Sequence, residues 1–459
     1  MDNLTQTLYD AVQAFLGFGP TVMLPIVLFI VGLIFRTPPA QALKSALLVG
    51  IGFVGVYAIF SILTNNVGDA ANAMVERIGV DLSIVDLGWP PLAAITWGGT
   101  IAPFVIPLTL VLNLLLISLR WTKTLNVDIW NYWHFALAGT LVFYATDNFF
   151  LGLLAAGITA IVILKVADWS APMVGRTFGL EGVSMPTLSA MVFFPIGMLF
   201  NWIIDRIPGL RNINIKPETI QRRLGVFGEP MMIGTILGIL LGIGAGYGVQ
   251  GVLTLGINLG AVMFILPKMV AILMEGLLPL SNSIKKWLKK RFPDRPDLYI
   301  GLDIAVAVGE PAVIATGLLL VPISLVLAFI VPGNNVLPLG DLANLAVFVS
   351  MIVLACRANI FRALLISIPI LVGNLLIATA IAPVITNMAK GVQFDLGGAS
   401  QVSGFLDGGN PFRYWLVEIF SGQWIALALI PIVGLLLWFT YKKTKAEVYG
   451  SKDETVANS

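Results

Sequence analysis

Long apolar segments alternate with short polar connections along most of this 459-residue chain. A helix needs roughly 20 apolar residues to cross the hydrocarbon core of a bilayer, because each residue rises only about 1.5 Å. The pattern predicts an all-α protein that spans the membrane many times. The windows that meet the length rule lie near residues 14–35, 42–64, 101–119, 129–147, 148–168, 184–204, 229–247, 251–279, 316–332, 342–357, 360–387 and 415–440.

The composition narrows the class of protein further. Hydrophobic residues make up 58% of the chain and charged residues 11%, whereas soluble domains carry roughly 25% charged residues. This difference excludes a soluble enzyme and a disordered chain. A net charge of +2 is too balanced for a protein that binds nucleic acid. The single cysteine, Cys356, and the single histidine, His134, exclude multi-Cys and multi-His metal sites, so we expect no metal and no cofactor.

The distribution of Lys and Arg predicts the orientation in the membrane, since short cytoplasmic loops are enriched in these residues. Basic residues cluster in 206–223, in 285–295 and in the C-terminal tail, which places all three in the cytoplasm. The acidic segment 65–88 is expected outside, together with the N-terminus. These assignments agree only if 184–204 does not make a simple single crossing. That segment either re-enters the membrane or lies inside the protein together with 170–184.

Two distant stretches share three motifs in the same order. Each has a proline-interrupted segment, then Pro-x-(Ser/Thr)-Leu-Val-Leu, then Asp-x-x-Asn-x-x-x-Phe, which begins at Asp128 in the first and at Asp341 in the second. The charge pattern places Asp128 at an inner membrane face and Asp341 at an outer one. The two halves are therefore predicted to be inverted repeats, an arrangement that places a transport site near the middle of the membrane.

The interrupted segments of the two repeats are 89–100 and 301–317. Both are too short and too rich in Gly and Pro to span the membrane, so each is expected to form a short helix and a turn. Irregular backbone at membrane depth is tolerated only against protein or a water-filled cavity. The segments are therefore predicted to be re-entrant hairpins that line a polar pocket.

The repeats divide the chain into scaffold and core elements. The predicted parts are a first repeat at 1–205 (scaffold helices 1–64, core elements 65–205), a basic cytoplasmic connector at 206–228, a second repeat at 229–387 (scaffold helices 229–279, core elements 280–387), an outer loop and last span at 388–440, and a cytoplasmic tail at 441–459.

Glu310 is the sharpest candidate for substrate binding. It lies between Gly309 and Pro311 in the second interrupted segment, and an ionisable group at membrane depth costs about 2.5–3.5 kcal/mol on insertion scales. The functional interpretation is that its carboxylate accepts hydrogen bonds from substrate hydroxyls. The alternative is a structural carboxylate that caps the exposed N–H groups beside the proline. Asp303, by contrast, is more consistent with a loop turn than with the polar shell of the pocket.

His134 and Asn131 share one helix face, because they are three residues apart. A neutral imidazole both donates and accepts hydrogen bonds, which suits a polyol hydroxyl. The alternative is that the aromatic residues around His134 form an interfacial belt and the imidazole is satisfied within the bundle. No phosphate-binding loop or nucleophile–base arrangement is present, so no catalytic residue is predicted. The further candidates for lining the cavity are two residues of the first interrupted segment and the repeat counterpart of Asn131: Thr96, Trp97 and Asn344.

Residues 282–297 combine a basic cluster with Trp287 and Phe292, as expected for a helix that lies at the inner membrane interface. Two functions remain open for this segment: anchoring to anionic lipid and docking of an acidic partner. The lysines that would dock the partner are Lys285, Lys286, Lys289 and Lys290.

Three segments carry a family resemblance: GEPMMIGTILGILLGIGAGYG at 228–248, GLDIAVAVGEPAVI at 301–314 and NYWHF at 131–135. They resemble the galactitol IIC permeases of the bacterial phosphoenolpyruvate-dependent sugar phosphotransferase system, in the ascorbate–galactitol superfamily. The likeness extends to about residue 450. It implies two inverted repeats, V-shaped dimerisation helices, and a transport core with two re-entrant hairpins around the sugar. A homodimer in the bacterial inner membrane, moving its core as an elevator, is also implied.

The function implied by the resemblance is group translocation. The permease binds galactitol outside and reorients it, and a cytosolic IIB protein, itself supplied by IIA, transfers phosphate to give galactitol 1-phosphate. The resemblance also places substrate contacts at Ser184 and Thr187. This sequence has no histidine there, which fits a neutral polyol in place of an acidic ascorbate.

Two other classes of function are weighed against this one. The first is a proton-coupled secondary transporter for a polyol or related polar solute, in which Glu310 would titrate. The second is a membrane-embedded enzyme that acts on a lipid-linked substrate. It is disfavoured because no paired carboxylates or metal ligands converge in the sequence.

Overall fold

The computed structural model describes residues 20–78, 83–126, 128, 130–219, 226, 229–291, 298–394, 396 and 399–457. The chain is mostly helical, as predicted. Within these ranges four helices are long and apolar enough to cross a membrane, namely Phe149–Phe178, Pro311–Ile330, Ile360–Gly391 and Trp424–Glu447. The pair Trp89–Gly98 and Ala102–Ser118 passes the same test together but is bent by 92°.

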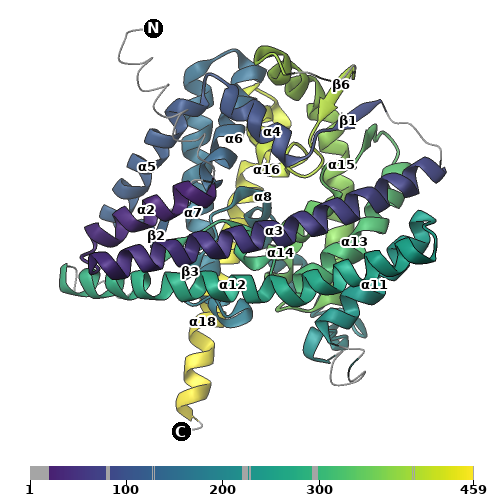
Figure 1. Cartoon of the computed structure of the whole chain (residues 1–459). Coiled ribbons are helices and arrows are strands. Elements are labelled where there is room, and N and C mark those ends of the chain that lie inside the picture. Colours follow the sequence, from purple (N-terminus) through teal and green to yellow (C-terminus); the bar gives the residue numbers. More distant parts are fainter. Residues whose placement is uncertain are drawn as a thin grey trace.

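One layer of the molecule consists of four helices: α2 (Pro20–Ile34), α3 (Pro39–Ile78), α11 (Pro230–Ala245) and α12 (Val249–Arg291). The two long helices, α3 and α12, run side by side across one face of the molecule (Figure 1). Glycines allow these backbones to approach closely. A Cβ at Gly276 of α12 would lie 2.8 Å from the carbonyl oxygen of Ser45 in α3, and one at Gly238 of α11 would lie 2.6 Å from that of Leu255 in α12.

The lengths of α3 and α12 differ from the sequence-based expectation. The windows 42–64 and 251–279 were expected to end before separate interfacial segments, but each belongs to one continuous helix, of 40 residues in α3 and 43 in α12. The polar stretch after each window contains no proline within the helix. Hydropathy therefore falls along these stretches while the helical backbone continues.

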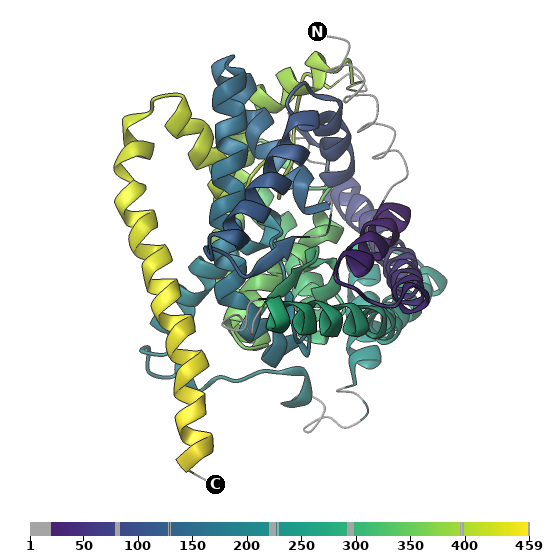
Figure 2. The same ribbon diagram turned by 90° about the vertical axis from the view of Figure 1, so that its left-hand side faces the viewer.

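The second body lies behind this layer, and the C-terminal helix stands on its far side (Figure 2). Its longer helices pack against one another around a large apolar core. They are α5 (Ala102–Ser118), α6 (Trp130–Thr146), α7 (Phe149–Phe178), α13 (Pro311–Ile330), α14 (Leu345–Ala355), α15 (Ile360–Gly391) and α18 (Ile430–Ala457). The shorter helices are α4 (Trp89–Gly98), α8 (Leu188–Met191), α9 (Phe193–Ile204), α16 (Pro411–Phe420), α17 (Trp424–Ala428), η1 (Leu210–Asn212), η3 (Ile304–Ala307) and η4 (Leu342–Asn344).

Two small parallel sheets lie inside this body, although the sequence predicted no strands. The first has the order β5-β1-β6 and the second the order β2-β4-β3. Each sheet takes its central strand from one half of the chain and its two outer strands from the other half. The bounds are β1 (Ile84–Asp86), β2 (Thr124–Asn126), β3 (Val183–Ser184), β4 (Tyr299–Gly301), β5 (Val336–Leu337) and β6 (Gln401–Ser403).

Several windows that resembled full spans are short helices that start inside the protein. The window 184–204 begins at Ser184, which is fully buried, and continues as α8 and α9 to the exposed Asp205. The window 342–357 contains only η4 and the 11-residue α14. Within 388–440, predicted as an outer loop and a last span, β6 pairs with β1 and the start of α16 is buried. Trp424–Glu447 is long and apolar enough for the predicted span. The sequence predicts no simple single crossing for 184–204, but it does not predict the buried strands, because pairing of two or three residues leaves no hydropathy signal.

The broken backbone predicted at both interrupted segments is confirmed. In the first, α4 ends at Gly98 and the chain turns sharply into α5. In the second, η3 ends at Ala307 and α13 begins at Pro311 after a turn. Asp128 and Asp341, which the charge pattern placed at opposite membrane faces, are both fully buried near the strands.

Replacing Gly340 with alanine is expected to destabilise the protein. The new Cβ would lie 2.5 Å from the Gly88 nitrogen and 2.6 Å from the Asp86 carbonyl oxygen, and overpacking of this kind costs about 1–3 kcal/mol. The measurement is the thermal unfolding temperature in detergent. Gly157→Ala in α7 is the matched control, because a Cβ there meets nothing within 4 Å. Equal unfolding temperatures for the two variants would contradict the close approach.

Candidate functional site

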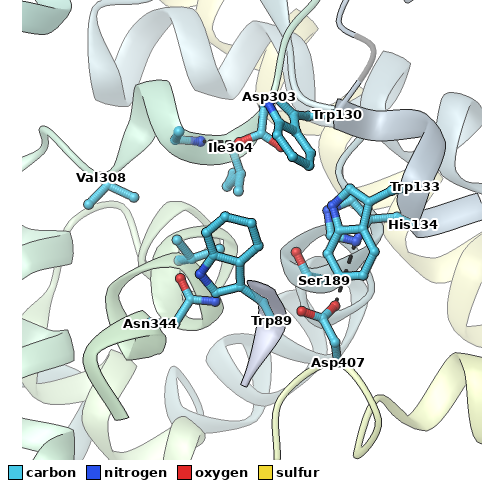
Figure 3. A pocket seen from close by; sticks show the side chains of 12 residues that line it. Trp89, Trp130, Trp133, His134, Ser189, Asp303, Ile304, Val308, Asn344 and Asp407 are labelled. Carbon is cyan, nitrogen blue, oxygen red and sulfur yellow. Dashed lines mark hydrogen bonds and ion pairs between the residues drawn. The ribbon is translucent and has the colours of Figure 1, made fainter. Parts of the chain in front are cut away.

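A pocket lies at the carboxyl ends of the six strands. Each strand is followed within two to seven residues by a side chain that lines the pocket: Trp89 after β1, Trp130 after β2, Ser189 after β3, Asp303 after β4, Asn344 after β5 and Asp407 after β6. Both halves of the chain therefore contribute to one site (Figure 3). The remaining lining residues are Trp133, His134, Ile304, Ala305, Val308 and Val347.

Two tryptophans on one side of the pocket are held by carboxylates at their backbone. Trp89 is the first residue of α4, and its N–H donates to the Asp341 carboxylate at 3.0 Å. Trp130 is the first residue of α6, and its N–H donates to the Asp128 carboxylate at 3.1 Å. The two indole rings meet edge to face with centroids 6.0 Å apart. The aromatic wall is thus positioned by capping of two helix N-termini.

The same carboxylates connect the two halves of the chain. Asp86 accepts hydrogen bonds from the N–H groups of Gly88, Phe405 and Asp341. Asp128 accepts one from the N–H of Asp303 at 2.9 Å. We call these contacts the Asp86–Asp341 junction and the Asp128–Asp303 junction. A buried carboxylate is costly unless it is hydrogen-bonded, and these accept several backbone donors that would otherwise lack partners.

Asp303 faces the pocket from a local turn. One carboxylate oxygen accepts the N–H of Ala305 at 2.9 Å, which caps η3. Below it, the Thr187 hydroxyl donates to the Asn131 side-chain oxygen at 2.7 Å and accepts the N–H of Ile304 at 2.9 Å. The turn interpretation of Asp303 is therefore confirmed, yet the same residue also belongs to the polar shell of the pocket.

A buried charged network forms another wall. The Arg413 guanidinium is fully buried and donates to the Asp407 carboxylate at 2.6 Å and to the Asp407 carbonyl at 2.8 Å. A second nitrogen of the guanidinium lies 2.9 Å from Nδ1 of His134. Asn410 caps α16 and so positions Arg413, since its side chain accepts the N–H groups of Phe412 and Arg413. The pair of Asp407 and Arg413 is neutral as a unit.

The predicted site residues separate into groups. His134 and Asn344 line the pocket, and Asn131 and Thr187 lie directly behind its wall. Ser184 lies deeper, where its hydroxyl pairs with that of Thr124. The two predicted residues of α4, Thr96 and Trp97, do not line the pocket. The Thr96 hydroxyl donates to the carbonyl of Leu92 in the same helix.

Glu310 is not part of this pocket, contrary to its place as the sharpest candidate. Its side chain lines a separate charged pocket at the start of α13. Burial and the nearby carboxylate of Glu218 raise the pKa of Glu310 to about 7. Glu310 therefore faces a cavity, as expected, but not the one lined by the tryptophans. The other charged residues of that pocket are Arg176, Lys216, Glu218, Arg357 and Glu447.

The four lysines proposed for docking lie at the end of α12, in continuous helix instead of a separate interfacial segment. The side chain of Lys286 is exposed. The side chains of Lys285, Lys289 and Lys290, and the whole of residues 292–297, lie outside the described part of the structure.

Sequence reasoning missed most of the aromatic and acidic residues of the site. Trp130 and Trp133 flank the predicted residues, but the sequence offers only an interfacial belt as an alternative role for them. Asp407 was assigned to an outer loop. A signal for it exists, since 404–411 reads Gly-Phe-Leu-Asp-Gly-Gly-Asn-Pro, an acidic residue in a Gly/Pro-interrupted apolar segment like that around Glu310.

Thr187→Val is expected to destabilise the protein by about 1–3 kcal/mol, the cost of leaving buried polar groups without partners. The change is nearly isosteric and removes both the acceptor for the Ile304 N–H and the donor to Asn131. Thr96→Val is the matched control. It removes only a hydrogen bond to the Leu92 carbonyl, which still accepts a backbone N–H within the helix. Thermal unfolding in detergent compares the two variants. A loss for Thr96→Val as large as for Thr187→Val would contradict the bridging role of Thr187.

Comparisons with known proteins agree with a membrane transport site. The family model described as "PTS system sugar-specific permease component" matches residues 14–398, where PTS denotes the phosphotransferase system. A protein of Escherichia coli K12 described as a permease IIC component is 39% identical over 92% of this chain and 97% of its own length. The PTS system galactitol-specific EIIC components of E. coli K12 and O157:H7 are each 35% identical over 96% of this chain and 98% of their own length.

The family match covers well over half of the chain, and the relatives align over nearly all of it. The apolar helices described above are consistent with a membrane permease. The chain therefore belongs to the family of PTS sugar-specific permease components, the membrane transport subunits of that system.

Proposed function

We propose that this permease binds galactitol in the pocket at the strand ends and carries it inward across the bacterial inner membrane. The observation that carries the proposal is the lining of that pocket. Three indole rings offer apolar faces to C–H groups, while Ser189, Asn344, His134 and Asp303 offer hydrogen-bond partners to hydroxyls. The 35% identity to galactitol-specific components over 96% of the chain supports the same solute.

The charge of the pocket favours a neutral solute over an acidic one. The Arg413 guanidinium contacts the lining residues His134 and Asp407, and its charge is paired with Asp407. The Asp303 carboxylate faces the pocket. An anion such as ascorbate would meet this carboxylate with no Lys or Arg among the described lining residues to balance it, whereas a hexitol brings hydroxyls that can donate to it.

We propose further that the two halves are inverted repeats that move as an elevator. Strand order supports the repeat: β1 is flanked by β5 and β6, and β4 is flanked by β2 and β3. Exchanging strands of the first half for their counterparts in the second converts one sheet into the other. In this scheme β6 and α16 belong to the second repeat, which extends it beyond residue 387.

The layer formed by α2, α3, α11 and α12, which we call the scaffold layer, is the proposed dimer interface. The cytoplasmic side is the proposed docking side for IIB and its donor IIA. The outward faces of the scaffold helices carry large exposed apolar side chains, as needed against lipid or a second copy. The N-terminus is placed outside and the C-terminus in the cytoplasm. IIB then transfers phosphate to the bound sugar to give galactitol 1-phosphate.

Two measurements test this function. Calorimetry on purified protein is expected to show binding of galactitol and none of ascorbate, with other hexitols as a specificity series. Uptake by membrane vesicles is expected to require phosphorylated IIB and to yield the sugar phosphate. Accumulation of unmodified solute driven by a proton gradient, without IIB, would show a secondary transporter instead.

Two acid-to-amide substitutions, at Asp303 and at Glu310, test which of the two pockets binds galactitol. Asp303→Asn is expected to weaken galactitol binding about tenfold or more, since a hydrogen bond to a charged group contributes about 1.5–3 kcal/mol. The amide oxygen can still accept the N–H of Ala305, so the turn is expected to survive. Glu310→Gln, outside the pocket, is expected to leave the affinity unchanged. The measurement is the galactitol affinity of each variant by calorimetry. A loss of affinity in Glu310→Gln alone would show that Glu310, and not Asp303, belongs to the substrate site.

Replacing the four lysines at the end of α12 with glutamine is expected to slow phosphorylation by IIB several-fold while galactitol affinity stays unchanged. A long helix with an exposed cationic end can attract an acidic partner surface. The rate of sugar phosphate formation at several IIB concentrations is the measurement. A normal rate of phosphorylation would exclude docking of IIB by these lysines and leave anchoring to lipid as their role. The positions are Lys285, Lys286, Lys289 and Lys290, and the matched control neutralises the cationic group on α18: Lys442, Lys443 and Lys445.

A further inference from the structure

We infer that Arg413 is a positioning residue that holds His134 in one tautomer, with its proton on Nε2. The imidazole then presents an N–H donor to the pocket and never an acceptor. This inference rests on the proposed function, because it describes how the pocket recognises a hydroxyl-rich solute. It assigns a role to a fully buried charge that the substrate itself does not touch.

The chemistry of the arginine decides the tautomer. A guanidinium carries only hydrogen-bond donors and stays protonated in proteins. Its terminal nitrogen lies 2.9 Å from Nδ1 of His134, within hydrogen-bond distance. Nδ1 must therefore act as the acceptor, with its lone pair toward Arg413. The one proton of a neutral imidazole is then on Nε2.

Asp407 does not compete for a proton on Nδ1. Its carboxylate oxygen lies 3.6 Å from Nδ1, too far for a hydrogen bond, and the same oxygen accepts from Arg413 at 2.6 Å. A proton on Nδ1 would point at the N–H of the guanidinium. Protonation of both ring nitrogens is opposed as well, because the imidazolium would be a second cation next to Arg413.

The surrounding contacts keep the guanidinium in place. Arg413 is anchored by both the carboxylate and the carbonyl of Asp407, and the Asn410 side chain accepts its backbone N–H. The ring of Trp133 lies 5.8 Å from the guanidinium carbon and 4.2 Å from the His134 ring, between centroids. The imidazole thus has a fixed Nδ1 partner and a packed face.

Among the described residues no hydrogen bond is found at Nε2, although the ring lines the pocket. A bound solute therefore meets an N–H donor at His134 and a carboxylate acceptor at Asp303. A hydroxyl can accept from the first and donate to the second, whereas a carboxylate or a ketone can only accept. The charge of the pocket favours a neutral solute, and the fixed tautomer in addition favours a solute with O–H groups.

The test uses the fact that His134 is the only histidine in the chain. Protein labelled with ¹⁵N-histidine gives one pair of ring-nitrogen resonances, and their shifts and couplings to the ring protons report the tautomer. The full-length protein in detergent at neutral pH is expected to show an unprotonated Nδ1 and a protonated Nε2. An Nδ1–H tautomer or a doubly protonated ring would overturn the inference.

Arg413→Lys keeps the charge but loses the planar fork, so mixed tautomers and at least a tenfold weaker galactitol affinity are expected. Arg362→Lys is the matched control: Arg362 also bonds an acid, Asp205, but away from the pocket, and both readouts are expected to stay unchanged. A single Nε2–H tautomer with full affinity in Arg413→Lys would also overturn the inference. If Arg413→Lys fails to fold, the spectrum of the unmodified protein decides. If that spectrum shows the Nε2–H tautomer but galactitol does not bind, the proposed function fails and the tautomer assignment stands.

Discussion

The constraint on which the rest of the structure depends is the satisfaction of backbone N–H groups where strands turn into helices inside the protein. Irregular backbone at membrane depth is stable only when its polar groups find partners within the protein. Here buried carboxylates are those partners, at the Asp86–Asp341 and Asp128–Asp303 junctions. Each junction joins a residue of one half of the chain to a residue of the other. The same contacts that make the broken helices stable therefore hold the two halves together.

This constraint also explains why the site lies where it does. Parallel strands end at one edge, and the helices that follow begin there with unpaired N–H groups and a positive end of the helix dipole. Trp89 and Trp130 are the first residues of their helices, so the carboxylates that cap α4 and α6 also orient the indole rings. A change in either junction would move an aromatic wall of the pocket, which couples the stability of the fold to the geometry of binding.

Sequence reasoning predicted the elements whose signal is local and missed those that depend on distant pairing. Gly and Pro at 89–100 and 301–317 correctly predicted broken backbone. Asn131 and His134 lie on one helix, where His134 lines the pocket and Asn131 lies behind its wall. Glu310 carried the same local signature as Asp407, an acid in a Gly/Pro-interrupted apolar segment. The register of β6 beside β1 brings Asp407 to the pocket, whereas Glu310, at the start of α13, lines a different one. Neither fact is encoded in hydropathy, and two- or three-residue strands leave no periodic pattern.

The division of polar groups between fold and solute gives the pocket its chemical character. Asp86, Asp128 and Asp341 direct their lone pairs to backbone donors, and Asp407 directs its charge to Arg413. The groups left for a solute are few, and two of them are fixed by a contact behind them: Asp303 by Ala305 and His134 by Arg413. A site of this kind discriminates by leaving its fixed donors and acceptors unpaired when a solute lacks the matching group, a penalty of about 1–3 kcal/mol for each buried polar group. The proposed selectivity for a neutral polyol therefore rests on the same buried network that stabilises the fold.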